Sequence, residues 1–278
     1  MVGRLDNGYH ELDSLICFAD TGDTVHAQPA DTLSLTVTGP FATGLGNDPD
    51  NLVLKAAAAL AKQSGEALGA SLRLEKNLPV ASGIGGGSAD AAATLHALNH
   101  LWQIGLDEKA LSRVGQSIGA DVPVCLFGRT AHVRGIGENI EQGPKMPEMG
   151  LLMVNPGVAV STATVFANRH GGFSGPVDLP ASFASAEALA GFLKQCRNDL
   201  LAPASALSPK IDAVLDHIAG QKDCLHASLS GSGATCFGLF DGFAQAQSAA
   251  SQIRVQQPKW WVQASRFLNV TPPPQTTA

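Results

Sequence analysis

The sequence has 278 residues, of which 45% are hydrophobic and 15% are charged, and its formal net charge is −6. This length suits two ordinary domains or one large one, and the apolar content suits a packed core rather than a disordered chain. The acidic balance argues against a nucleic-acid binder, no apolar run could span a bilayer, and the first residues lack the apolar core of a signal peptide. We therefore expect a cytoplasmic protein with no nucleic-acid or membrane partner. We also expect a monomer or weak homodimer, which the composition does not determine.

The first half of the sequence mixes strands and helices. We expect strands at 12–18, 24–28, 32–38, 70–75, 122–127 and 130–134, and helices at 52–62, 88–102 and 107–118. The clean alternation of apolar and polar residues over 32–37 favours a half-buried antiparallel strand. Asp48-Pro49-Asp50-Asn51 reads as a turn and cap before the first helix. In the helix at 88–102, one face carries Ala91, Leu95, Leu98 and either Leu101 or Trp102, which predicts that this face is buried.

A stretch rich in Pro and Met, 143–149, suggests a domain boundary. Beyond it we expect strands at 150–155, 225–229, 235–240 and 261–265, and helices at 184–195, 209–219 and 243–253. This order is typical of a split βαβ, ferredoxin-like unit. We therefore predict domains at 1–145 and 146–268, followed by a disordered tail at 269–278.

The sequence has five cysteines, an odd number, and they are scattered along the chain with no Cys-x-x-Cys pair. This pattern favours reduced cysteines in a cytoplasmic protein over a disulfide or zinc framework.

The most informative motif is Pro79-Val80-Ala81-Ser82-Gly83-Ile84-Gly85-Gly86-Gly87-Ser88-Ala89, between an expected strand and an expected helix. Glycines let backbone N–H groups converge, and a helix start adds unpaired donors and partial positive charge. Together they predict an anion cradle suited to a polyphosphate, against the alternative of a plain strand-to-helix turn. No lysine follows Gly87, which excludes a Walker loop, and Ser88 breaks the dinucleotide-binding pattern.

Three further motifs carry chemistry-bearing residues. Asp121, in Gly119-Ala120-Asp121-Val122-Pro123, could orient or deprotonate an acceptor hydroxyl, or could be a surface or capping residue. A second glycine motif, Leu229-Ser230-Gly231-Ser232-Gly233-Ala234-Thr235-Cys236-Phe237, could close over a site or form a hairpin turn. In Asn7-Gly8-Tyr9-His10-Glu11-Leu12, the single tyrosine and the histidine could stack and hydrogen-bond a base, or form a turn with a packed tyrosine and a solvated histidine.

Taken together, these motifs resemble those of the GHMP small-molecule kinases, from about Val2 to Leu268. The resemblance also includes Asp50-Asn51-Leu52, Leu98-Asn99-His100-Leu101-Trp102, Arg134-Gly135-Ile136-Gly137-Glu138, Asn155-Pro156-Gly157-Val158 and Arg197-Asn198-Asp199. It implies an α+β fold of two domains, an N-terminal one like ribosomal protein S5 domain 2 and a C-terminal ferredoxin-like one. Gly8-Tyr9-His10 points to the branch that transfers the ATP γ-phosphoryl group to the 2-hydroxyl of 4-diphosphocytidyl-2-C-methyl-D-erythritol in non-mevalonate isoprenoid biosynthesis.

The resemblance also assigns roles to residues. Asp121 would be catalytic, and Tyr9, His10 and Phe166 would hold the cytosine, with a core position on a short helix as the alternative for Phe166. Mg²⁺ is expected, and Ser88 would reach it. The ATP phosphates would be held by Pro79, Gly83, Ile84, Gly85, Gly86, Gly87, Ser88 and Ala89.

One departure from the family pattern concerns the start of the sequence. The family has a segment like Ala-Pro-Ala-Lys-Leu-Asn-Leu before the Gly-Tyr-His motif, with a lysine beside the catalytic aspartate; the printed sequence starts at Met1-Val2-Gly3-Arg4. We expect this chain, as printed, to be poorly soluble or nearly inactive, and a start-site error, a truncation and a real loss all remain open. The alternatives to the main function are another GHMP kinase and a non-catalytic nucleotide- or metabolite-binding protein.

Overall fold

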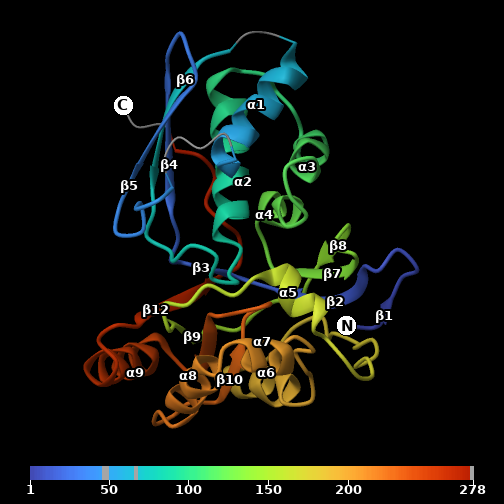
Figure 1. Ribbon diagram of the computed structural model, residues 1–278, viewed down its shortest axis with the longest axis vertical. Coiled ribbons are helices and arrows are strands. Elements are labelled where there is room, and N and C mark those ends of the chain that lie inside the picture. The colour runs from blue at the N-terminus through green and yellow to red at the C-terminus, as the bar shows by residue number, and fades with distance from the viewer. Residues whose placement is uncertain (46–49, 66–67, 276–278) are drawn as a thin grey trace. The chain divides into compact units, whose positions relative to one another are not determined.

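The computed structural model describes residues 1–45, 50–65 and 68–275. The chain forms two compact units, each built from segments that are not contiguous in sequence (Figure 1). The first unit consists of Met1–Thr21, Ala81–Ile84 and Arg129–Asn269, and the second of Gly22–Val80, Gly85–Gly128 and the chain from Val270. The contiguous ranges 1–145 and 146–268 remain a prediction for the two domains. Of the predicted turn and tail, Asp48-Pro49 and residues 276–278 lie outside the described residues.

The second unit packs helices on one face of a three-stranded sheet (Figure 1). Its sheet has the order β4-β6-β5, with β4 at Thr24–Pro29, β5 at Ser34–Thr38 and β6 at Ala70–Glu75. Its helices are α1 (Leu52–Ser64), α2 (Gly86–Leu101), α3 (Glu108–Gln116) and α4 (Val122–Phe127). Alternate residues of β6, namely Ala70, Leu72 and Leu74, are buried and form one core with the predicted α2 face of Ala91, Leu95 and Leu98.

Helix α1 begins and ends where local chemistry predicts. The Asn51 side chain accepts a hydrogen bond from the Val53 N–H at 2.9 Å, which satisfies one unpaired donor of the first turn. Gly65 ends the helix with a left-handed backbone, φ +77°, a conformation that costs glycine little. The Asp50-Asn51-Leu52 motif therefore positions the helix start.

Two predictions in this unit are wrong. β5 pairs with β6 in parallel, not antiparallel, because alternation reports only that one face is buried, and the intervening helix α1 makes a crossover connection. The run Val122–Phe127 is helix α4, not a strand. A short apolar run does not distinguish the two, and here Pro123 in the first turn and Gly128 at the C-terminal end, φ +61°, favour the helix.

The first unit contains two sheets. One has the order β1-β2-β7-β8, all antiparallel, with β1 at Gly3–Arg4, β2 at His10–Ile16, β7 at Ala131–Gly135 and β8 at Asn139–Gln142. The other has the order β10-β11-β9-β12-β3, with β10 at His226–Leu229, β11 at Cys236–Phe240, β9 at Gly150–Asn155, β12 at Trp261–Leu268 and β3 at Phe18–Ala19. The antiparallel order β10-β11-β9-β12 is that of a ferredoxin-like sheet, as predicted.

Central strand β9 explains how this sheet packs on both faces. Leu152 and Val154 point into one core with helix α8 (Lys210–Ala219) and α9 (Phe243–Gln256), whereas Leu151 and Met153 point into another with α6 (Ala186–Leu193). Two short helices complete the unit: α5 (Thr162–Ala167), which carries Phe166, and α7 (Leu201–Leu207), which the sequence did not reveal. The cysteines of the described chain are all free. None of its described helices is long and apolar enough to cross a membrane.

Candidate active site

The glycine motif forms a turn that leads directly into α2. Gly83 and Gly85 have left-handed backbones, with φ +76° and +71°, and Gly85 stands at the N-terminal end of the helix. The first helical bond runs from the Ala89 N–H to the Gly85 carbonyl at 2.9 Å, so the amides of Gly86, Gly87 and Ser88 belong to the first turn, where backbone donors lack helical partners. The exposed Gly85 and Gly87 leave this turn open to a ligand.

The second glycine motif packs against the first. The Ser230 hydroxyl donates to the Gly83 carbonyl at 3.1 Å, and the Thr235 N–H donates to the Ser82 carbonyl at 3.0 Å. A Cβ on Gly83 would lie 2.3 Å from the Gly233 carbonyl oxygen, so this close approach of two backbones requires glycine. The turn between β10 and β11 therefore holds one end of the glycine motif in place.

A buried ion cluster that sequence reasoning missed supports the other end. Lys76 Nζ bonds Asp23 and, at 2.9 Å, Asp90 Oδ2, and these side chains are at most 7% exposed. A Cβ on Gly86 would lie 3.4 Å from this ammonium, which places the cluster directly under the helix start. The signal in the sequence was a lysine two residues before the apolar Leu78-Pro79 step that leads into the motif.

The charges in this cluster shift one another's pKa values. Burial raises the pKa of Asp90 to about 7 against the opposing attraction of Lys76. For Lys76 itself, burial lowers the pKa, but the two carboxylates outweigh it and the net shift is upward. Lys76 is therefore the ammonium that two buried carboxylates share.

Asp121 occupies the position before the first residue of α4, where it makes no capping bond with its side chain. The residue is open to solvent, yet neighbouring protein atoms desolvate the carboxyl and raise its pKa. Burial raises the pKa of the Cys125 thiol to about 12, with the carboxylates of Asp121 and Asp90 adding to the shift. Both carboxylates therefore lie near the same thiol, so Asp121 is close to the helix that follows the glycine motif.

The predicted base-binding residues lie in the first unit. Tyr9 is in the turn between β1 and β2 and is 61% exposed, so it does not pack on the core. The His10 ring is half-buried and lies 5.4 Å from the Phe166 ring, centroid to centroid. Phe173, which the sequence did not single out, lies 6.3 Å from His10 on the same measure. Burial and, after it, the charges of Arg4 and Arg169 lower the pKa of His10, which favours a neutral imidazole.

Comparison with known proteins decides the family. Residues 51–129 match the description "GHMP kinases N terminal domain" and residues 184–257 match "GHMP kinases C terminal". The chain belongs to the GHMP kinase family. A protein of Paramagnetospirillum magneticum named 4-diphosphocytidyl-2-C-methyl-D-erythritol kinase is 49% identical over 97% of this chain and 94% of its own length. One of the same name from Rhodospirillum rubrum is 48% identical over 98% of this chain and 89% of its own.

Solved structures agree with this assignment. A crystal structure of 4-(cytidine 5'-diphospho)-2C-methyl-D-erythritol kinase has a TM-score of 0.75 at 30% identity and covers 96% of this chain and 93% of its own. A homoserine kinase from Cytophaga hutchinsonii, with a TM-score of 0.69 at 21% identity, covers 92% and 89% and shares the fold. The predicted α+β GHMP kinase fold is therefore confirmed.

GHMP kinases use ATP as the phosphate donor, and the glycine motif fits a polyphosphate. Its first helical turn is open, and a bulkier residue at Gly83 would displace the backbone. No group of three or more His, Cys, Asp or Glu in the described chain could hold a metal ion. A Mg²⁺ ion bound mainly through nucleotide phosphates and water needs no such cluster. Ser88, in the first turn of α2, stays the predicted protein ligand.

Proposed function

We propose that this chain is the ATP-dependent kinase that phosphorylates the 2-hydroxyl of 4-diphosphocytidyl-2-C-methyl-D-erythritol in non-mevalonate isoprenoid biosynthesis. The observation that carries the proposal is the base site: His10, kept neutral by its surroundings, lies beside Phe166 in a chain whose phosphate motif is that of a kinase. A neutral imidazole offers one donor and one acceptor to the edge of a cytosine, and aromatic rings stack on its faces.

In the proposed reaction, the backbone donors of Gly85 to Ser88 hold the phosphates of ATP. The substrate hydroxyl oxygen forms a bond to the γ-phosphorus as the bond from that phosphorus to the bridging oxygen of ADP breaks. The Asp121 carboxylate accepts the hydroxyl proton or orients it. Mg²⁺, with Ser88 as a candidate ligand, would neutralise the charge on the phosphates during transfer.

The test is an ADP-release assay with the cytidyl substrate, with homoserine and mevalonate as competing acceptors in separate reactions. We expect the turnover, low as it is in the chain as printed, to be greater with the cytidyl substrate than with the other two. Turnover with homoserine or mevalonate alone would make the chain another GHMP kinase. ATP binding with no turnover on any acceptor would favour a non-catalytic binding protein.

An Asp121→Asn variant tests the catalytic assignment in the same assay. It keeps the side-chain shape but removes the proton acceptor, so turnover should fall by about 10²–10⁴-fold with ATP binding little changed. Asp31→Asn, at an exposed position of the same unit, is the matched control and should keep wild-type turnover. Near-normal turnover of Asp121→Asn would contradict a proton-accepting role.

A further inference from the structure

The Arg197-Asn198-Asp199 motif, between α6 and α7, has no part in the chemistry described so far. The Asn198 side-chain amide donates to two carbonyl oxygens, those of Leu229 at 3.1 Å and Gly231 at 2.8 Å. Its own oxygen accepts from the Leu200 N–H at 2.9 Å, which fixes the orientation of the amide. Both carbonyls belong to the second glycine motif, so two hydrogen bonds from Asn198 fix that turn.

The turn that Asn198 holds is the one that contacts Gly83. Ser230, between the two bonded carbonyls, donates to the Gly83 carbonyl, and Gly233 packs so closely on Gly83 that a Cβ would not fit. Because this contact has no free space, a displacement of the turn is passed on to the glycine motif. Asn198 therefore reaches the glycine motif indirectly, because it bonds the turn between β10 and β11 and that turn packs on Gly83.

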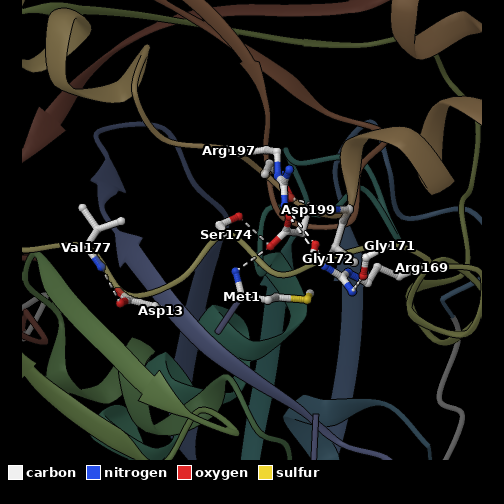
Figure 2. A network of polar contacts seen from close by, with 11 residues as sticks. Met1, Asp13, Arg169, Gly171, Gly172, Ser174, Val177, Arg197 and Asp199 are labelled. Carbon is white, nitrogen blue, oxygen red and sulfur yellow. Dashed lines mark hydrogen bonds and ion pairs between the residues drawn. The ribbon is translucent and has the colours of Figure 1, made fainter. Parts of the chain in front are cut away.

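Asp199 faces a different segment (Figure 2). Its carboxylate is 2% exposed and accepts from Arg197 Nε at 2.7 Å, from the Ser174 hydroxyl at 2.8 Å and from the Met1 amino group at 2.8 Å. Arg169 forms a longer ion pair with it at 3.8 Å. Burial alone would raise the pKa of Asp199, but these donors and charges hold it below its ordinary value, so the carboxylate is ionised.

The same arginines fix the backbone of the segment 169–174. Arg169 Nη1 donates to the Gly171 carbonyl at 2.7 Å, and Arg197 Nη2 donates to the Gly172 carbonyl at 3.0 Å (Figure 2). The Arg169 side chain is 4% exposed and the Arg197 side chain is 59% exposed, and the buried Asp199 carboxylate pairs with both guanidinium groups. Asp199 is therefore the group that allows both arginines to hold this segment.

The segment carries Phe173 to the base site. The guanidinium carbon of Arg169 lies 4.0 Å from the centre of the Phe173 ring, within the range of a cation–π contact. The Phe173 ring is 39% exposed and lies beside His10, on whose ring Phe166 also packs. Any loosening of the segment would move one aromatic wall of the proposed cytosine site.

We propose that Asn198 and Asp199 are positioning residues that set two parts of the site separately. Asn198 fixes the second glycine motif against Gly83, and Asp199 fixes the segment 169–174, with Phe173, beside His10. The inference rests on the proposed function for the identity of the two ligands. It predicts that substitutions at these two adjacent residues weaken the binding of different substrates.

The test compares two changes of similar shape, Asn198→Asp and Asp199→Asn. Asp at 198 cannot donate to the two carbonyls, and Asn at 199 cannot pair with two guanidinium groups. We expect Asp199→Asn to weaken CDP binding and raise the KM for the cytidyl substrate about 5- to 30-fold, the factor that one or two lost hydrogen bonds give, with ADP affinity changed less than about twofold. Asn198→Asp should weaken ADP binding by the same order and leave CDP affinity nearly unchanged.

Binding of CDP and ADP is measured by calorimetry, so the result does not depend on turnover. Two milder variants serve if either change prevents folding: Ser174→Ala removes one donor to Asp199, and Ser230→Ala removes the hydroxyl that reaches Gly83. Each should give the same selective loss with smaller amplitude. Asp199→Glu, which restores the charge, should recover part of the CDP affinity.

Equal losses of CDP and ADP affinity in both variants, together with a lower Tm, would mean that the motif only stabilises the unit and would overturn the inference. Unchanged affinities would overturn it as well. A wild-type protein that binds CDP and ADP but does not turn over the cytidyl substrate would refute the proposed function while the selective losses still supported the inference. A wild-type protein that does not bind CDP would overturn the half that concerns Asp199.

Discussion

Replacing Lys76 with methionine leaves two buried carboxylates without the cation they share. Lys76 Nζ lies 2.9 Å from Asp90 Oδ2 and also bonds Asp23, and the side chains are 5%, 7% and 1% exposed. Asp23 keeps its two backbone donors, the N–H groups of Asn77 and Leu78, but Asp90 loses its ion-pair partner. Removing one partner of a buried pair costs about 3–5 kcal/mol, so we expect a loss of this size in the free energy of unfolding above neutral pH.

The loss should depend on pH in a defined direction. Burial already raises the pKa of Asp90 to about 7 in the wild-type chain, and without Lys76 the folded-state value rises further. An acid whose pKa is higher in the folded state than in the unfolded state contributes less stability as pH rises towards the folded-state value. In the wild type, Asp90 is ionised above about pH 7, and stability no longer changes through this carboxyl group. In the variant, stability continues to fall as the pH rises above 7, by up to about 1.4 kcal/mol per pH unit.

Urea unfolding at pH 6.5 and pH 8.5 measures this difference. Fluorescence of Trp102 follows the second unit if Trp260 and Trp261 are replaced by phenylalanine, since the Trp102 indole donates to the Gly69 carbonyl within that unit. Lys55→Met is the matched control, because Lys55 pairs with Asp50 on the surface, where solvent screens the ion pair, and its loss should change stability little. Similar losses in the two lysine variants, or a larger loss at pH 6.5 than at pH 8.5, would refute the reasoning.

Three further predictions concern the candidate site. Tyr9→Ala should raise the KM for the cytidyl substrate more than that for ATP, since a stacked base contributes about 1–3 kcal/mol; equal effects in kinetic assays would remove Tyr9 from the base site. Because its lowered pKa keeps His10 neutral, CDP affinity measured by calorimetry should be flat above pH 6.5 and fall only below it, and His10→Gln should abolish this dependence. Gly83→Ala should abolish nucleotide binding through the 2.3 Å clash with Gly233, whereas Gly44→Ala, with the same left-handed strain but open space around it, should cost only about 1–2 kcal/mol of stability. Nucleotide affinity of Gly83→Ala equal to that of Gly44→Ala would show that the close approach is not needed.

Local patterns in the sequence were enough to predict the strand and the helix on either side of the phosphate motif. Strand β6 has the predicted bounds, and α2 begins at Gly86, two residues before the predicted start. Strand β9 also has its predicted bounds, and the order of strands and helices after it predicted the ferredoxin-like sheet. These features follow from periodicity, glycine placement and capping, which act between neighbours along the chain.

Only the tertiary structure decided what lies beside these elements. The direction of β5 depends on the crossover through α1, and the helical state of Val122–Phe127 depends on its ends, not on its apolar run. Lys76 meets Asp23 and Asp90 from 53 and 14 positions away. Phe173 lies beside His10 in a segment whose residues bond Asp199, Arg169 and Arg197. Such contacts depend on packing between distant segments, and a single sequence records the residues that make them but not which ones meet.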